Sequence, residues 1–371
     1  MHMNFSQKHP LMYGLFRRTL TIVVTWNVIL LCLIGTLITF GVFGAVAALG
    51  AGSESSTSGY QPVYGSGSRQ FLSVPVTGVI AGTNHSDDSL SFFSSTGMAY
   101  GYDIKDELYR AADDSTIDGV ILEIDSPGGT IYGARAIADG VKYFKAKTDN
   151  KKPVYAHIEG TGASGAYWAA VSADKVFSDY GSDVGSIGVI LGPIQFYDKV
   201  VATDGGLLGG GVVTQNGIES SYITAGTSKD VGNPYRRLTA DEVNKLQSQV
   251  NNEYDGFVKY VSERRNIPAD TIKGQIGAMA YDPKTAKDLK LIDEIGSRQD
   301  AYDALAGAAG VQGNDYSVVK EYSQASFVQS LLGAVTRKSE PKAVEFDKCA
   351  LTRQSLAYHG DVGSWCSAKG Q

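Results

Sequence analysis

A single serine stands in a run of small residues that leaves room for another backbone beside its hydroxyl. Ser164 lies in the stretch GTGASGAYWAA, residues 160–170. One interpretation is a nucleophile against which a substrate backbone can lie. The other is a tight strand-to-helix connection, where glycine and alanine let backbones pack closely. The stretch alone does not decide between the two, so the rest of the sequence must supply the partners that a nucleophile needs.

A base is the first of these partners, because a free serine hydroxyl is hardly ionised at neutral pH. Among the five histidines of the chain, only His157 falls on the predicted strand that leads to Ser164. We interpret it as a structural histidine of that strand rather than as the base. The G-x-S-x-G elbow of α/β hydrolases is also absent, because Ala166 stands where that motif has its second glycine.

A lysine can serve as the base instead, provided that its amine is neutral. Lowering its pKa from about 10.4 to about 7 costs roughly 4–5 kcal/mol, which only burial in an apolar pocket supplies. Such a lysine should follow a strand or a tight turn rather than lie on a solvated helix face. Lys229, in ITAGTSKDVGNP, meets this condition better than Lys175 or Lys199.

Backbone amides that could hold a developing negative charge are the second partner. The tetrapeptide SPGG, residues 126–129, ends a predicted buried strand and opens a helix. Its glycines can turn bare N–H groups toward a ligand at the positive end of that helix. A plain glycine-rich turn is the alternative interpretation of this tetrapeptide.

Both segments sit in a pattern of alternating strands and helices, which indicates an α/β domain with mainly parallel strands. A capping box at Thr239 and Glu242 predicts the start of a long helix. Asp282 followed by Pro283 predicts the start of another. The remaining predicted strands are residues 71–80, 118–125, 152–158, 175–179 and 186–191, and the remaining predicted helices are residues 131–147 and 163–173.

The N-terminal part contains an uncharged stretch long enough to cross a bilayer. Residues 20–50 carry no charge, and a bilayer core needs about 20 apolar residues. A cleavable signal peptide is the alternative, although its apolar region is normally only about 7–15 residues long. We predict a transmembrane anchor at residues 19–50, with residues 1–18 in the cytoplasm because basic residues precede the anchor. The Gly/Ser-rich residues 51–71 predict a linker.

Composition excludes several other classes of function. A net charge of −6 gives no sign of a nucleic-acid-binding surface. The three cysteines have no metal-ligand spacing, so a metal site is not expected. Outside the cytoplasm Cys349 and Cys366 could pair, but two free thiols are equally compatible with the sequence.

The motifs SPGG, GASGAYWAA, GSIGV, TAGTSKD and AYDPKTAKDLKLIDEIG occur in one order along the chain. In that order they resemble the signal peptide peptidase A family of membrane-bound serine proteases, in its short single-domain bacterial form. The resemblance covers residues 72–305. It implies an α/β fold of the ClpP/crotonase-like type and a Ser–Lys dyad that needs no cofactor and no metal.

The resemblance also gives roles to residues in the matching motifs. It makes Ser164 the nucleophile, Lys229 the general base, and Ser186 a hydrogen-bond partner that positions the lysine amine. It places an oxyanion hole at two backbone N–H groups, that of Gly165 and that of either Gly128 or Gly129.

The expected protein is thus a membrane-anchored serine endopeptidase that degrades remnant signal peptides or other apolar peptides at the membrane. The expected partners are peptide substrates, the bilayer through residues 19–50, and further copies of the chain in a tetramer or octamer. The protease domain, residues 72–305, and a C-terminal extension, residues 306–371, are expected outside the cytoplasm of a bacterial cell. Two alternatives stay open: a crotonase-like acyl-CoA enzyme, and a non-catalytic membrane-anchored scaffold or pseudo-protease.

Overall fold

The computed structural model describes residues 18–19, 21–33, 35–36, 59–83, 97–198, 200–203, 212–218, 222–322 and 355–360 of the 371-residue chain. The chain divides into two compact units, Met1–Ser58 and Gly59–Gln371. In the first unit, residues 21–33 are helical and their side chains are exposed. No helix within the described ranges combines the length and the apolar character needed to cross a membrane. The rest of the predicted anchor lies outside the described residues.

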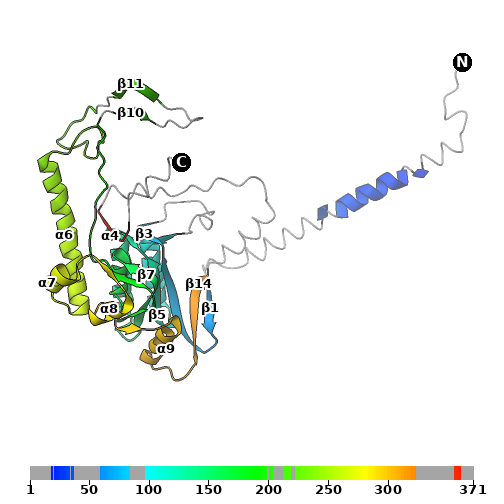
Figure 1. The fold of residues 1–371 in the computed structure, drawn as a ribbon. Helices are drawn as coiled ribbons and strands as arrows, with labels where there is room; N and C mark the ends of the chain where they lie inside the picture. Colours follow the sequence, from blue (N-terminus) through cyan, green and yellow to red (C-terminus); the bar gives the residue numbers. More distant parts are fainter. Residues whose placement is uncertain are drawn as a thin grey trace, which may run out of the picture. The chain divides into compact units, whose positions relative to one another are not determined.

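The second unit is built on a mixed sheet whose central strands are parallel (Figure 1). In the described part the sheet has nine strands. Seven follow the order β1-β14-β2-β5-β7-β8-β13, while β9 pairs with β7 and β12 pairs with β9. A smaller sheet has the order β15-β6-β3-β4, and β10 pairs with β11 in a separate hairpin. The α/β class predicted from the sequence is therefore confirmed.

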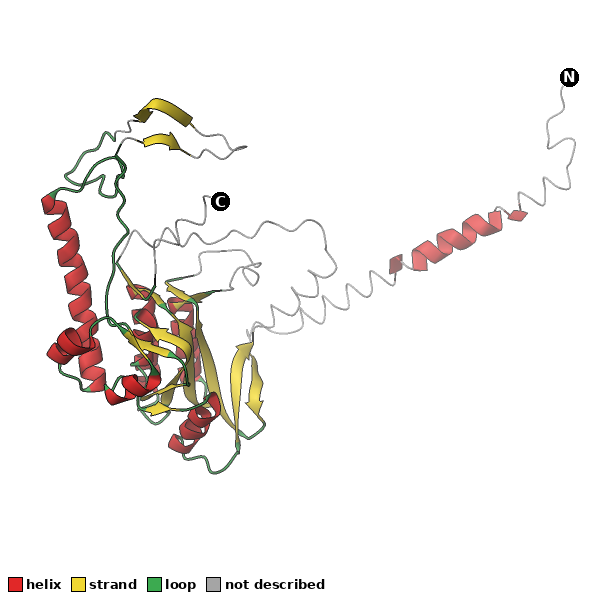
Figure 2. Ribbon diagram, in the orientation of Figure 1, coloured by secondary structure: helices red, strands yellow, loops and turns green. Residues whose placement is uncertain are grey.

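Figure 2 distinguishes the helices and strands by colour. The strands are β1 (Gly59–Gly65), β2 (Arg69–Thr77), β3 (Val79–Ala81), β4 (Met98–Tyr100), β5 (Ile117–Ser126), β6 (Gly128–Thr130), β7 (Val154–Ala163), β8 (Lys175–Ser178), β9 (Asp183–Gly185), β10 (Val200–Thr203), β11 (Val212–Ile218), β12 (Ala280–Tyr281), β13 (Glu294–Ile295), β14 (Tyr316–Tyr322) and β15 (Leu356–Tyr358). The helices are α3 (Gly101–Asp113), α4 (Ile131–Lys147), α5 (Gly165–Ala170), α6 (Ala240–Arg265), α7 (Ala269–Thr271), the π-helix η2 (Ile272–Ile276), α8 (Pro283–Asp288) and α9 (Arg298–Ala308).

The central strand β5 shows why the sheet forms where the sequence is most apolar. Its sequence IDGVILEIDS is buried on both faces, as expected for a parallel strand covered by helices. Val120 and Leu122 point into the main core, which also includes apolar residues of α3, α4 and α5. Ile121 points to the other face and packs in a second cluster with residues of α9. Burial on both faces fixes the strand register, and with it the position of the turns at the ends of β5 and β7.

The predicted helix starts are confirmed. Thr239 and Glu242 form a reciprocal capping box at the start of α6. The side chain of Asp282 accepts hydrogen bonds from the backbone N–H groups of Lys284 and Thr285, with Pro283 at the first helical position of α8. The predicted helix at residues 131–147 is α4, with the same bounds.

The structure differs from the sequence expectations at the borders of the domain and at one strand. Residues 59–65 of the expected linker form β1, and residues 316–322 of the expected C-terminal extension form β14, so the sheet reaches beyond residues 72–305 on both sides. The two strands pair with each other. Local sequence patterns do not encode such a contact between segments that are far apart in the sequence. The predicted strand at 186–191 was wrong. Ser186 has a φ of 52°, which is not extended backbone, and only Ile190 forms a β-bridge there.

Candidate active site

Ser164 lies at the turn between β7 and α5, in a strained backbone conformation. Its φ of 57° and ψ of −118° are unfavourable for a residue with a Cβ atom. Such strain persists where the surrounding structure over-determines it, and it is typical of functional sites. The N–H of Ser164 donates to the Gly185 carbonyl at 2.7 Å, which helps to hold this conformation. The Oγ hydroxyl donates to the Gly188 carbonyl at 3.3 Å, and the residue is 1% exposed.

The three predicted oxyanion-hole glycines converge beside this serine. An ideal Cβ on Gly128, whose φ is 94°, would lie 2.7 Å from the Gly165 nitrogen, so only glycine fits there. An ideal Cβ on Gly165 would lie 3.3 Å from the Gly129 nitrogen. The N–H of Gly128 is already used, because it donates to the Ser126 hydroxyl at 3.1 Å. Between the two glycines that the sequence left open, Gly129 is therefore the better partner for Gly165.

The space enclosed by these glycines holds a backbone carbonyl from the far end of the chain. Ideal Cβ atoms on Gly128 and Gly165 would lie 2.2 Å and 2.9 Å from the carbonyl oxygen of Ala357. Ala357 belongs to β15, which pairs antiparallel with β6. Sequence reasoning missed this strand, since three residues give no periodic signal. The converging N–H groups thus face a position where a carbonyl oxygen can lie.

Ser186 is also at the site, but with a different partner from the one expected. It directly follows β9, and its backbone N–H donates to the Met279 carbonyl at 2.7 Å. Its Oγ lies 3.0 Å from Nδ1 of His359. The predicted partner, the amine of Lys229, does not hydrogen-bond to Ser186 in the part of the chain that the structure describes. His359, a residue of the tail, was not a candidate in the sequence.

Lys229 lies in an exposed turn between β11 and α6. Its backbone N–H donates to the Gly226 carbonyl at 3.3 Å. Within the described residues, no hydrogen bond joins its side-chain amine to Ser164. A single chain therefore brings together the serine, Ser186 and the glycines, but it leaves the lysine in solvent. The predicted role of Lys229 stays a prediction.

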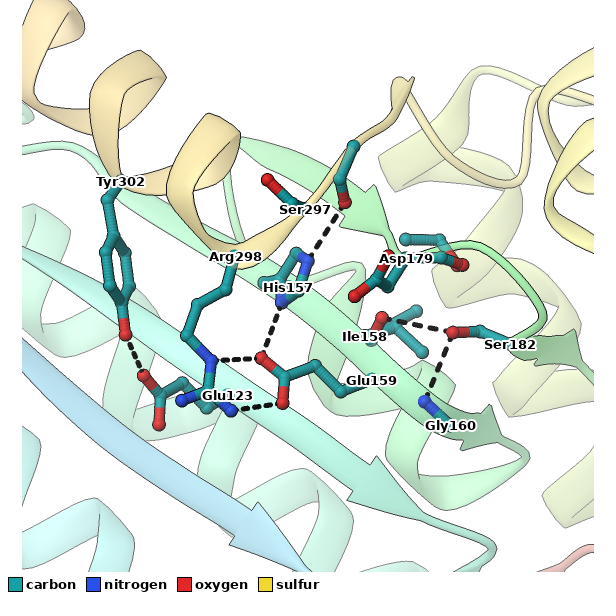
Figure 3. A network of polar contacts seen from close by, with 12 residues as sticks. Glu123, His157, Ile158, Glu159, Gly160, Asp179, Ser182, Ser297, Arg298 and Tyr302 are labelled. Carbon is teal, nitrogen blue, oxygen red and sulfur yellow. Dashed lines mark hydrogen bonds and ion pairs between the residues drawn. The ribbon is translucent and has the colours of Figure 1, made fainter.

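His157 is a structural residue, as its position on a strand suggested. It is 0% exposed, and its ring nitrogens lie 3.1 Å from Oε1 of Glu159 and 3.1 Å from the carbonyl oxygen of Gly296. Figure 3 shows Arg298 on the other side of Glu159, with Tyr302 beside Glu123 in the same network. The hydrogen bonds from Arg298 lower the pKa of Glu159, which keeps this carboxylate charged. The network ties α9 to β7 and β5.

The fold and the site define an α/β protein with a strained, buried serine beside converging backbone amides. Residues 146–312 match the family model described as Peptidase family S49. This part of the chain is therefore similar to the peptidases of that family, and the motifs of the chain resemble the signal peptide peptidase A type within it. The match supports the resemblance seen in the sequence motifs.

Two relatives illustrate the range of this similarity. The chain is 34% identical over 213 residues to the putative protease MJ0651 of Methanocaldococcus jannaschii, covering 57% of this chain and 62% of that protein. It is 30% identical over 241 residues to the putative signal peptide peptidase SppA of Enterococcus faecium, covering 65% of this chain and 64% of that protein. The chain thus spans less than two thirds of the length of these relatives.

Among solved structures, a ClpP1 mutant from Listeria monocytogenes is similar at a TM-score of 0.37 and 15% sequence identity, covering 63% of this chain and 94% of that one. This score is too low to define a fold type. The ClpP/crotonase-like assignment therefore remains an expectation within the confirmed α/β class.

Proposed function

We propose that the chain is a serine peptidase in which Ser164 attacks the carbonyl carbon of a peptide bond. The observation that carries the proposal is the convergence of Ser164, strained and buried, with the amides of Gly129 and Gly165. Backbone N–H groups fixed in this way stabilise the oxyanion of a tetrahedral intermediate and need no rearrangement during the reaction. The match of residues 146–312 to a peptidase family supports the same reaction class.

In the proposed mechanism a neutral Lys229 amine accepts the proton of the Ser164 hydroxyl as the oxygen attacks. The protonated amine then delivers this proton to the leaving nitrogen, and water later releases the acyl group from the serine. The exposed position of Lys229 in a single chain means that the amine must first become buried beside Ser164. Assembly with further copies of the chain, expected as a tetramer or octamer, would provide such burial.

We further propose that residues 19–50 anchor the chain in a bacterial cell membrane, with the peptidase unit outside the cytoplasm. The uncharged sequence of residues 20–50 supports an anchor. A relative carries the name signal peptide peptidase, which supports remnant signal peptides as substrates. An apolar peptide left in the bilayer would then lie close to the tethered site.

Covalent labelling tests the proposed nucleophile against the two alternative functions. A fluorophosphonate reacts with an activated serine, so we expect the full-length chain to gain one adduct at Ser164, located by mass spectrometry of its peptides. Ser164→Ala should remove the adduct. Ser172→Ala is the matched control, because Ser172 is also buried and its hydroxyl donates to the Ala169 carbonyl of its own turn.

A failure to label, together with turnover of acyl-CoA thioesters, would instead support a crotonase-like enzyme. Failure of both reactions would support a non-catalytic scaffold.

Gly165→Ala tests the oxyanion hole without touching the serine. The new methyl carbon would lie 2.9 Å from the carbonyl oxygen that now occupies the hole and 3.3 Å from the Ala134 Cβ. We expect kcat/KM for peptide hydrolysis to fall about 10²- to 10³-fold, together with a lower melting temperature, because the backbone near the new methyl carbon must shift. Gly256→Ala on α6 is the control, because open space surrounds that position. Unchanged hydrolysis by Gly165→Ala would contradict the assignment of the oxyanion hole.

A further inference from the structure

The turn that carries Lys229 is joined to the start of α6 by the side chain of Arg236. On one side the guanidinium donates to both carboxylate oxygens of Asp230, at 2.8 Å and 2.6 Å. On the other side it donates to both carboxylate oxygens of Glu242, at 2.8 Å each. Its Nη1 also donates to the backbone carbonyl of Arg237 at 3.1 Å. A planar guanidinium can bond two carboxylates in this way, whereas a lysine ammonium cannot.

Both carboxylates of this Arg236 cluster, which comprises Asp230, Arg236 and Glu242, have further partners. Glu242 is 3% exposed and accepts the backbone N–H of Thr239 at 2.8 Å, as part of the capping box of α6. Asp230 accepts a hydrogen bond from the side-chain amide of Asn233 at 3.4 Å. The hydrogen bonds from Arg236 lower the pKa of Asp230 to about 2, and they also lower the pKa of Glu242. Both carboxylates therefore stay charged at neutral pH.

The backbone around Lys229 forms tight turns in one defined conformation. The Lys229 N–H donates to the Gly226 carbonyl at 3.3 Å. The Val231 N–H donates to the Ser228 carbonyl at 3.1 Å. Ser228 has a φ of 64°, which is unfavourable for a residue with a Cβ atom. Such strain persists where the surrounding structure over-determines it, and the bonds of Arg236 to α6 supply that support.

The pairing of Arg236 with Asp230 also determines the charge beside the proposed base. Asp230 directly follows Lys229, with Cα atoms about 3.8 Å apart, so the carboxylate and the amine lie within the range of electrostatic interaction. A nearby carboxylate favours the ammonium form of a lysine, whereas a general base must be neutral. The guanidinium of Arg236 offsets one of the two carboxylate charges in the cluster.

The other charged groups near the start of α6 lie outside the Arg236 cluster. Asp241 pairs with Lys245 at 2.7 Å on the surface of the helix. The guanidinium of Arg237 lies over the ring of Phe196, 4.2 Å from its centre. Asp198 is exposed on the adjoining segment and forms no ion pair with the cluster within the described residues. Asp241 and Arg237 thus provide matched control positions for the cluster.

We propose that Arg236 is a positioning residue for the amine of Lys229. It holds the turn in one conformation against α6, and it offsets the charge of Asp230 so that the amine can lose its proton when it becomes buried. The inference rests on the proposed function, because it takes Lys229 as the general base. It does not depend on which copy of the chain supplies the serine.

The pH dependence of peptide hydrolysis by the full-length chain tests this role. With a lysine base, kcat/KM should rise with pH as the amine of the free enzyme loses its proton. Arg236→Gln leaves both carboxylates unopposed, and they stabilise the ammonium. We therefore expect the midpoint of the rising limb to move about 0.5 to 1 pH unit higher. Arg237→Gln is the matched control and should leave the midpoint in place.

Asp230→Asn should have the opposite effect. It removes the carboxylate beside the amine, while its amide oxygen can still accept a hydrogen bond from Arg236. We expect the midpoint to move about 0.5 pH unit lower, and Asp241→Asn is the matched control. Combining Arg236→Gln with Asp230→Asn should bring the midpoint back toward that of the unmodified chain. Partial unfolding would lower the rate at every pH and would not move the midpoint in opposite directions.

Acylation with acetic anhydride reads the Lys229 amine without requiring hydrolysis, because only a neutral amine reacts. Mass spectrometry of the peptides gives the rate at one fixed pH, with the exposed Lys259 of α6 as the internal reference. We expect the rate at Lys229 to be about 2- to 5-fold lower in Arg236→Gln, higher in Asp230→Asn, and unchanged in the two control variants.

Unchanged midpoints and unchanged acylation rates in Arg236→Gln and Asp230→Asn, while melting curves show folded chains, would overturn the inference. If Arg236→Gln does not fold, the downward shift expected for Asp230→Asn decides the test. Failure of the proposed function gives a different pattern. In that case the unmodified chain neither hydrolyses peptides nor reacts with a fluorophosphonate, while acylation of Lys229 still responds to both variants.

Discussion

Ser164→Ala is expected to lower kcat/KM for peptide hydrolysis by about 10⁶-fold, the size of the loss when a serine peptidase loses its nucleophile. The side chain lost is small, and its only hydrogen bond in the described structure is the 3.3 Å contact to the Gly188 carbonyl. Removing such a bond costs about 1 kcal/mol of unfolding free energy. The effect on activity should therefore far exceed the effect on stability.

The measurement pairs initial rates on an alanine-containing apolar peptide with thermal unfolding of the same samples. Ser172→Ala again serves as the control, since it removes a buried hydroxyl that lies just after the C-terminal end of α5, whereas Ser164 lies at its N-terminal end. If Ser164→Ala retains hydrolysis within tenfold of the unmodified chain, the nucleophile has been assigned to the wrong residue. If both variants lose activity with lower melting temperatures, the loss reflects unfolding instead.

Sequence patterns predicted those parts of the site that depend on local interactions. The run of apolar residues in β5, the caps of α6 and α8, and the small residues around Ser164 each act over a few neighbouring positions. Local sequence signals therefore predicted the serine at a strand-to-helix turn and the glycines at the end of a buried strand. The structure has both at these places. At these positions the conformation is determined mainly by residues that are close in the sequence.

The parts that escaped prediction depend on pairing between distant segments. β15 joins residues 356–358 to residues 128–130, and β14 places residues 316–322 between β1 and β2. A three-residue strand such as β15 contributes no periodicity, and its stability comes from the two backbones on either side of it. The same limit explains Ser186, whose left-handed φ is held by a bond to Met279 from another part of the chain. The GSIGV motif alone could not show that bond.

Lys229→Arg tests the base, and it is expected to reduce kcat/KM for hydrolysis by about 10²- to 10⁴-fold, the usual contribution of general base catalysis. A guanidinium remains charged in proteins, so it cannot accept the proton of the Ser164 hydroxyl. Because Lys229 is exposed in a single chain, the substitution should leave the melting temperature unchanged. Lys259→Arg on α6 is the matched control, since that lysine is also exposed and pairs only with Glu263 within its helix. Full activity of Lys229→Arg would exclude the amine as the base.

Because Lys229 is exposed in a single chain, its amine could act on the serine of its own chain or on that of another copy. No hydrogen bond links it to Ser164 in the described chain, so the proposed dyad requires burial of the amine against another surface, which a second copy of the chain could offer. If copies supply each other's lysine, mixing Ser164→Ala chains with Lys229→Ala chains should restore hydrolysis that neither variant has alone. A mixture that assembles, as judged by light scattering, yet stays inactive would require both groups to come from one chain. Restored hydrolysis would instead show that assembly brings the lysine of one copy to the serine of another.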